Sequence, residues 1–261
     1  MSFDAGWLDL RAPADAAARA PDLLARARTY LTATPGALAL DLGAGTGATA
    51  RAFATPGVRW RLLDADPDLL AHAAQRTPAA ETVVMDLSRL DALPLAGVRL
   101  VTASALLDLA SAQWLDTLAR RLAQANLAVY AALTYDGSLE WTPAHPDDAA
   151  VAAGFNRHQR GEKGLGGPAL GPDAAPCLAA ALTRLGFRVS VAASPWRLHP
   201  GALLDALTDG IAAAAAETGV ETRAWRQARA ATVFASVGQV DLFATPPAAS
   251  AQSKTTSVSS P

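Results

Sequence analysis

The chain has 261 residues, of which 51% are hydrophobic, and its formal net charge is −2. This length and apolar content suffice for one large α/β domain with insertions. The net charge gives no indication of a basic surface that would bind nucleic acid. The N-terminus lacks a basic segment followed by an apolar one, so we expect no signal peptide. The single Cys177 excludes an internal disulfide, and the most apolar helical run, 211–216, is too short to cross a bilayer. These features predict a cytoplasmic protein that does not span a membrane.

Residues 1–35 predict a helical segment, because Leu23, Ala27 and Leu31 recur at helical spacing. Strand-like runs then alternate with helical runs as far as residue 245. We expect strands at 37–42, 58–63, 81–86, 98–106, 127–134, 187–193 and 236–244, and helices near 46–54, 67–76, 111–124 and 173–185. Such alternation predicts a parallel sheet covered by helices on both faces.

Three segments depart from this alternation. Residues 136–172 are rich in Gly, Pro, His and Arg with little periodicity, which predicts a long, lid-like excursion after the fifth strand. Residues 201–232 predict a helical insertion before the last strand. Residues 246–261 contain no apolar residue beyond alanine and one valine, so we expect a disordered tail after a domain of 36–245. Neither an internal repeat nor a metal-ligand cluster is recognisable, so no metal is expected.

The most informative motif is Ala-Leu-Ala-Leu-Asp-Leu-Gly-Ala-Gly-Thr-Gly at residues 37–47. A strand that ends in a glycine-rich turn lets backbone N–H groups approach a ligand, because no Cβ stands in the way. Asp64 ends the next predicted strand about 20 residues later, where an acid can bond ribose hydroxyls. Asp86 ends the third. Open α/β sheets bind ligands at this carboxyl end of their strands.

This combination resembles the motifs of class I S-adenosylmethionine-dependent methyltransferases. The resemblance implies a three-layer, Rossmann-like α/β fold of seven strands, all parallel except an antiparallel seventh strand that lies between the fifth and sixth. It also implies S-adenosylmethionine as cofactor. The methionine end would be held by Asp41, Gly43, Ala44, Gly45 and Gly47, and the sulfonium would face Ser104. Asp64 would bond the ribose, and the adenine would lie beside Ala65, Asp86 and Leu87.

The glycines alone leave other functions open. Gly43, Gly45 and Ala48 also fit the G-x-G-x-x-G/A pattern of a nicotinamide-dependent oxidoreductase, and both cofactor classes explain Asp64. The helical sequence before the glycine strand and the acid Asp86 favour the methyltransferase. A non-catalytic protein that binds S-adenosylmethionine is a third possibility, and the oligomeric state is left open.

The acceptor is expected to be a small molecule, because an Asn-Pro-Pro-Tyr run is missing and the lone Cys177 lies inside a predicted helix. The sequence does not say whether oxygen, nitrogen or carbon is methylated. Arg157, His158, Arg160 and Lys163 predict a basic cluster that clamps an anionic acceptor, and the alternative is a solvated basic loop without a ligand. Asp108 and His158 are the candidates for removing a proton, although position alone favours Asp108 as the cap of the helix expected from residue 111.

Overall fold

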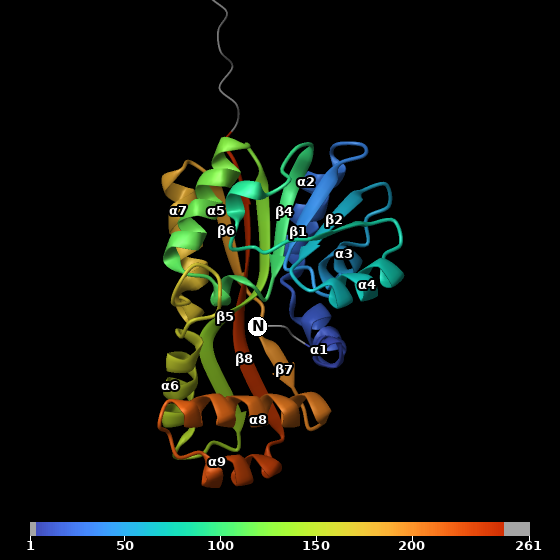
Figure 1. Cartoon of the computed structure of the whole chain (residues 1–261). Coiled ribbons are helices and arrows are strands. Elements are labelled where there is room, and N and C mark those ends of the chain that lie inside the picture. The colour runs from blue at the N-terminus through green and yellow to red at the C-terminus, as the bar shows by residue number, and fades with distance from the viewer. Residues whose placement is uncertain (1–3, 248–261) are drawn as a thin grey trace, which may run out of the picture.

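The computed structural model of the protein describes residues 4–247. Its centre is one sheet with the strand order β3-β2-β1-β4-β5-β8-β6, and the short strand β7 pairs with β8 (Figure 1). β1 to β5 pair in parallel, whereas β8 runs antiparallel to β5 and β6. The strands are β1 (Leu38–Leu42), β2 (Arg59–Asp64), β3 (Glu81–Val84), β4 (Val98–Ser104), β5 (Ala128–Thr142), β6 (Arg188–Ala193), β7 (Trp196–Leu198) and β8 (Phe234–Thr245). The expected Rossmann-like sheet, with its antiparallel last strand between the fifth and sixth, is confirmed.

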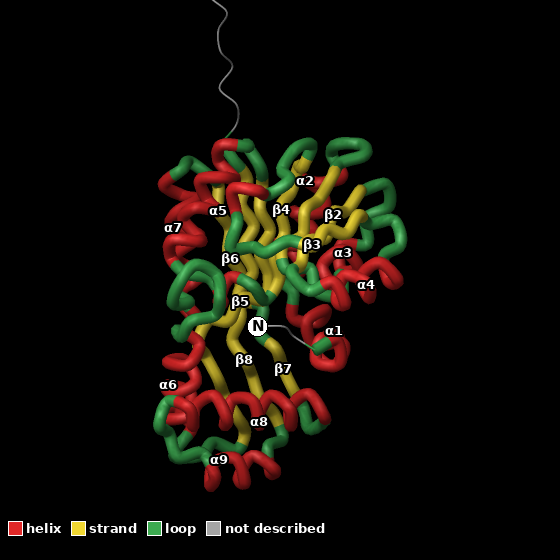
Figure 2. Tube along the Cα trace, viewed as in Figure 1, coloured by secondary structure: helices red, strands yellow, loops and turns green. Residues whose placement is uncertain are grey.

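Helices cover both faces of this sheet (Figure 2). They are α1 (Ala5–Ala18), α2 (Pro21–Thr32), α3 (Ala48–Phe53), α4 (Pro67–Arg76), α5 (Ala112–Gln124), α6 (Asp148–Gln159), α7 (Ala174–Arg184), α8 (Ala202–Glu217) and α9 (Arg223–Ala228). One buried cluster lies between the sheet and α5 and α7, and a second lies between the sheet and α2, α3 and α4. Within residues 4–247, no helix has both the length and the apolar character that a membrane span requires.

Local signals explain several helix boundaries. The Ser111 hydroxyl accepts a hydrogen bond from the Trp114 N–H at 3.2 Å, which caps the start of α5. Asp108 is therefore not the cap of this helix; it lies in the preceding single turn, Leu107–Leu109. Gly186 has a φ of +83° and ends helix α7, as its position in the sequence predicts.

The prediction of a long excursion without regular structure over 136–172 is wrong for its first half. β5 continues to Thr142 and pairs with β8 along its whole length, and α6 follows from Asp148. Asp136 and Gly137 resemble a turn locally, but they form an irregularity in the pairing between Tyr135 and Leu139. The partner strand lies about a hundred residues later in the chain, so local sequence does not reveal the pairing.

The lower halves of β5 and β8, together with β7, extend the sheet beyond the ends of the parallel strands (Figure 1). α6, α8 and α9 lie around this extension, and a third buried cluster fills it, centred on Trp141, Val151, Ile211 and Trp225. The extension therefore lies next to the carboxyl ends of the strands, where the glycine turn is found.

Candidate active site

The glycine turn connects β1 to α3. Gly43, Gly45 and Gly47 have φ of +62°, +52° and +79°, in the left-handed region that disfavours side chains. A Cβ at Gly43 would lie 3.0 Å from Leu106 Cδ1, and one at Gly45 would lie 3.1 Å from Leu8 Cδ1. The turn therefore has no room for side chains at these two positions.

A cavity of about 520 Å³ lies against this turn. The end of β2, the segments after β3 and β4, and the helix α1 complete its wall. This is the position at which open α/β sheets bind ligands, and the volume is typical of small-molecule sites. Of the ten residues that the sequence assigned to the cofactor, eight line this cavity: Gly43, Ala44, Gly45, Asp64, Ala65, Asp86, Leu87 and Ser104.

The other two residues, Asp41 and Gly47, lie behind the turn and do not line the cavity. Asp41 is 1% exposed, and its Oδ1 accepts a hydrogen bond from the Thr102 hydroxyl at 2.6 Å, whereas its Oδ2 is buried without a partner. Burial raises the pKa of Asp41 to about 6, against the opposing effects of the Thr102 bond and of the Arg19 charge. A Cβ on Gly47 would point toward Ala73 on α4. Both residues are therefore directed toward other parts of the fold than the cavity.

Two carboxylates face the cavity from the ends of β2 and β3. Asp64 Oδ2 accepts a hydrogen bond from the Gly45 N–H at 2.8 Å, and its Oδ1 accepts one from the Asp66 N–H at 3.0 Å. Asp64 thus holds the glycine turn in place as well as lining the cavity. Asp86 is exposed, and hydrogen bonds from Ser88 lower its pKa.

Arg19 is a supporting residue that the sequence did not indicate; it does not line the cavity but bonds Ser104, which does. It lies in the linker between α1 and α2, is 5% exposed, and donates from Nη2 to the Ser104 hydroxyl at 2.9 Å. Its Nη1 is buried without a hydrogen-bond partner. No local signal marks this arginine, because its partner lies 85 residues later.

Asp241 on β8 is a second such residue. Its buried carboxylate accepts hydrogen bonds from the Tyr130 hydroxyl at 2.8 Å and from the N–H groups of Ala20 and Leu133 at 3.0 and 2.9 Å. Leu133 has a left-handed φ of +56°, which is costly for a branched residue. Asp241 therefore fixes both the helix linker and an irregular point of β5.

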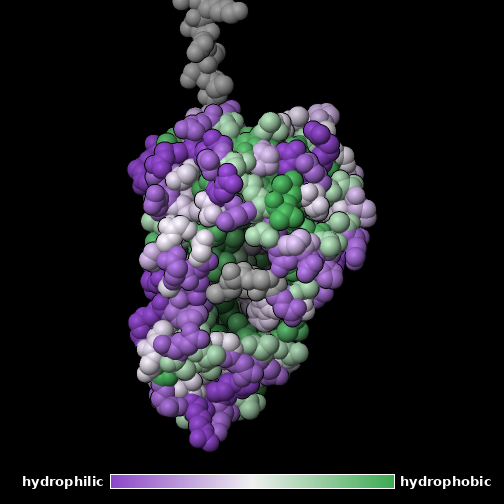
Figure 3. All heavy atoms as spheres, in the orientation of Figure 1, coloured by the Kyte–Doolittle hydropathy of each residue, from purple (hydrophilic) through white to green (hydrophobic). Residues whose placement is uncertain are grey.

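A second cavity, of about 240 Å³, lies between the glycine-turn cavity and the sheet extension. We call it the acceptor cavity; Figure 3 shows apolar residues inside the hollow on this face. Four aromatic side chains line it, Trp7, Tyr135, Phe155 and Trp196, with aliphatic residues of β5, α8 and β8. The two cavities share the lining residues Arg11, Ala105, Leu109 and Lys163, so they adjoin each other.

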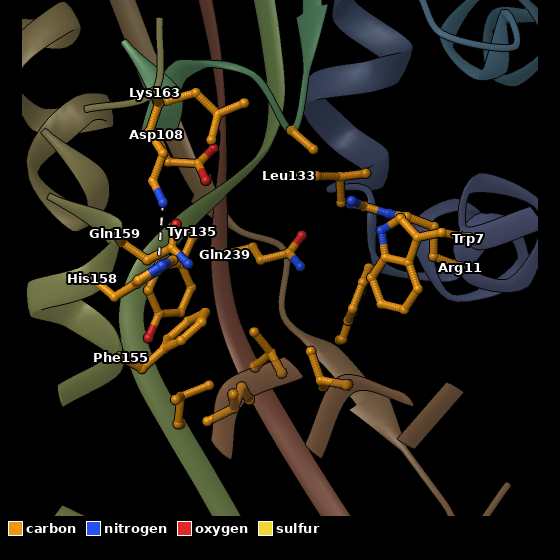
Figure 4. A pocket seen from close by; sticks show the side chains of 17 residues that line it. Trp7, Arg11, Asp108, Leu133, Tyr135, Phe155, His158, Gln159, Lys163 and Gln239 are labelled. Atoms are coloured by element: carbon orange, nitrogen blue, oxygen red, sulfur yellow. Dashed lines mark hydrogen bonds between the residues drawn. The ribbon is translucent and has the colours of Figure 1, made fainter. Parts of the chain in front are cut away.

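Asp108 is the carboxylate of the acceptor cavity (Figure 4). It precedes Leu109, which lines both cavities, so it lies close to their junction. Its Oδ1 is buried and has no hydrogen-bond partner. Burial raises the pKa of Asp108 to about 6, against the opposing charges of Arg11 and Lys163. A carboxylate with this pKa can accept a proton near neutral pH.

Lys163 and His158 also line the acceptor cavity, and Lys163 Nζ lies 3.4 Å from His158 Nδ1 (Figure 4). Burial lowers the pKa of Lys163 from its usual value. His158 Nε2 lies 3.1 Å from a carboxylate oxygen of Glu217 on α8. Two of the four residues predicted to clamp the acceptor thus meet at this cavity.

The other two point elsewhere. Arg157 donates to the Thr218 hydroxyl, and Arg160 forms an ion pair of 2.8 Å with Asp173. Neither lines either cavity. Both lie in the last turn of α6 or at its C-terminal cap, where arginine is favoured by the helix dipole without any ligand.

Comparisons with known proteins agree with this geometry. Residues 39–125 match the family model described as "Methyltransferase domain". Residues 39–125 are therefore a methyltransferase domain, as the resemblance to class I S-adenosylmethionine-dependent methyltransferases predicts. The match decides between the two cofactor classes in favour of S-adenosylmethionine. No curated protein sequence matches the chain.

Solved structures share the fold of this chain. A cyclopropane-fatty-acyl-phospholipid synthase-like protein from Lactobacillus casei is 18% identical with a TM-score of 0.52, and the match covers 91% of this chain and 99% of that one. The YcgJ protein from Bacillus subtilis is 13% identical with a TM-score of 0.50, over 86% and 98% of the two chains. At these identities the likeness concerns the fold alone.

The residues of the first cavity fit S-adenosylmethionine. The ligand carries an ammonium and a sulfonium cation, and Asp41, two residues before the turn, has a buried carboxylate oxygen, Oδ2, without a hydrogen-bond partner. The ligand also carries ribose hydroxyls and an adenine amino group, which donate to carboxylates such as Asp64 and Asp86. The glycines supply a turn without side chains on the cavity side.

Proposed function

We propose that this methyltransferase methylates a small molecule that binds in the acceptor cavity, with its nucleophilic atom at the junction of the two cavities. The observation that carries this proposal is the wall shared by Arg11, Ala105, Leu109 and Lys163. Methyl transfer requires the acceptor atom to lie in line with the bond between the methyl group and sulfur. Two adjoining cavities, one for the cofactor and one for the acceptor, allow this alignment at their junction.

S-adenosylmethionine, when bound, supplies a methyl group whose bond to sulfur breaks with its electron pair moving to sulfur. For the glycine-turn cavity we propose that Gly43, Ala44, Gly45 and Ser104 hold the methionine end, with Asp41 and Gly47 lying behind the turn. Asp64 would bond the ribose, and Ala65, Asp86 and Leu87 would surround the adenine.

On the acceptor side, we propose Asp108 as the group that takes a proton, with Lys163 as the cation nearest the nucleophile. His158 acts through Lys163, because it is the one hydrogen-bonding partner that Lys163 has among residues 4–247. Arg11 carries less free charge, since Asp15 holds it with two hydrogen bonds of 2.9 and 3.0 Å. In this scheme the acceptor atom facing Lys163 becomes anionic as its proton moves to Asp108, and Arg157 and Arg160 take no part.

Filling the acceptor cavity tests this assignment. Leu207 on α8 lines the cavity, whereas Ala213 on the same helix is exposed. Leu207→Trp should abolish turnover of a metabolite panel with S-adenosylmethionine and leave cofactor affinity within twofold, as measured by calorimetry. Ala213→Trp is the matched control and should leave both unchanged. Full turnover by the Leu207→Trp variant would show that the acceptor binds elsewhere.

A further inference from the structure

The walls of the acceptor cavity are suited to a flat apolar body. Trp7, Tyr135, Phe155 and Trp196 come from four different elements, and the Tyr135 and Phe155 rings meet edge to face at 5.5 Å. Aromatic rings prefer such offset or edge contacts with one another. An apolar cavity of ~150 Å³ is enough for benzene, so about 240 Å³ accommodates a substituted single ring.

At the junction, two groups of opposite charge face this cavity without pairing to each other. Asp108 and Lys163 form no ion pair, and the buried Oδ1 of Asp108 has no donor within the described residues. A protonated amine would be attracted by Asp108 but repelled by the Lys163 ammonium, and a carboxylate would be attracted by Lys163 but repelled by Asp108. Neither ligand suits both groups. A hydroxyl satisfies both groups, because its proton is donated to Asp108 while its oxygen accepts from Lys163.

Gln239 on β8 is a third polar group of this cavity (Figure 4). It is 5% exposed, and its Oε1 is buried without a hydrogen-bond partner. A buried amide oxygen without a donor is unfavourable, so a second donor on the ligand would satisfy it. The cavity thus combines an apolar body with polar groups at two places.

We propose that the methyl acceptor is a single-ring phenol whose hydroxyl lies between Asp108 and Lys163 and whose second polar substituent reaches Gln239. The O–H bond breaks as its proton moves to Asp108, and the oxygen lone pair forms the bond to the methyl group that S-adenosylmethionine supplies. Lys163 stabilises the negative charge that develops on the oxygen. Asp108 then returns its proton to solvent. This inference rests on the proposed acceptor cavity.

Binding measurements with S-adenosylhomocysteine present test the proposal without turnover. Phenol should bind at least about tenfold more tightly than toluene, benzylamine or benzoate, all with one ring. At least one of the three benzenediols should bind more tightly than phenol, and Gln239→Leu should remove that gain. Tighter binding of the amine, of the carboxylate or of toluene would overturn the proposal, as would the absence of binding by all four rings. A lack of gain from every diol would overturn the role of Gln239.

Variants give an independent readout. Asp108→Asn and Lys163→Met should each reduce the preference for phenol over toluene by about tenfold or more. Asp173→Asn changes an exposed carboxylate outside both cavities and should keep the full preference. The affinity for S-adenosylhomocysteine checks that each variant is folded. Failure of the unmodified protein to bind S-adenosylhomocysteine would contradict the cofactor site itself, whereas normal cofactor binding with no preference for phenol contradicts the phenol assignment alone.

Discussion

Arg19 donates a hydrogen bond to the Ser104 hydroxyl at 2.9 Å and thereby ties the linker between α1 and α2 to the end of β4. The guanidinium is 5% exposed, and Nη1 has no partner. A buried cation with an unpaired donor costs stability, so its position is better explained by the site than by folding. The Arg19 charge also acts on Asp41, which lies on β1 just before the glycine turn, and opposes the rise in its pKa.

Replacing Arg19 with methionine should weaken binding of S-adenosylmethionine. The Ser104 hydroxyl would lose its fixed orientation, and we expect a rise in Kd of about tenfold, the equivalent of one charge-assisted hydrogen bond. Calorimetric titration measures this directly. Arg26→Met is the control, because Arg26 bonds the Ser190 hydroxyl on the surface. Equal affinities in both variants would contradict a role for Arg19 in the site.

Asp64→Ala should weaken cofactor binding by about 1–3 kcal/mol, the range for hydrogen bonds to a charged group. Two losses contribute, since the carboxylate holds the Gly45 N–H and is proposed to bond the ribose. Asp68→Ala removes an exposed acid in the first turn of α4, outside the cavity, and should have no effect. An unchanged Kd for Asp64→Ala would remove this carboxylate from the cofactor site.

Gly45→Val should abolish cofactor binding, because the side chain would both strain the turn and fill the space beneath Leu8. Strain alone costs roughly 1–2 kcal/mol per left-handed residue. Gly57→Val is the matched control: Gly57 also has a positive φ, +78°, but nothing lies within 4 Å of its Cβ position. Gly45→Val should lose at least as much melting temperature as Gly57→Val, because only its side chain meets a neighbour, and only Gly45→Val should lose the cofactor.

The sequence predicted those parts of the site that local signals encode. A strand ending in glycines and acids at the ends of successive strands are short-range patterns, and Gly45, Asp64 and Asp86 line the cavity as expected. Asp108 was also singled out, but its position beside the acceptor cavity follows from the fold of the α6 and α8 segments, which local sequence does not specify.

The parts that sequence missed depend on distant pairing. Arg19 and Asp241 contact partners across 85 and 221 residues, and neither lies in a recognisable motif. The extension of β5 past Asp136 depends in the same way on β8. The predicted basic clamp at 157–163 included Arg157 and Arg160, which line neither cavity. Charge composition does not reveal which side chains a helix directs toward a cavity.

The acceptor-side reaction should lose rate as the pH falls through about 6. The folded-state pKa of Asp108 is raised to about 6, and only the deprotonated carboxylate can take a proton. The kcat/KM for phenol should therefore fall about tenfold per pH unit below that value and level off above it. The charged and titratable groups that line the cavity with Asp108 are Lys163, Arg11, His158 and Tyr135.

The control for this profile is Asp108→Asn, which should be slower and should lack the acid limb. Saturating S-adenosylmethionine is needed, because Asp41 also titrates near pH 6 and would alter cofactor affinity in the same range. Asp173→Asn should keep the full profile. An acid limb that persists in Asp108→Asn would assign the proton acceptor to another group.

The last prediction separates the two halves of the basic run at 157–163. Arg157 and Arg160 are held by Thr218 and Asp173 outside both cavities, whereas Lys163 lines both. The double variant Arg157→Ala, Arg160→Ala should therefore leave the acceptor KM within twofold, and Lys163→Met should raise the acceptor KM or lower kcat by about tenfold. Cofactor Kd, measured by calorimetry for each variant, checks that the protein is folded. If the double variant impaired turnover as much as Lys163→Met, the two arginines would have to swing into the acceptor cavity during the reaction, and the placement of the acceptor against Lys163 alone would be wrong.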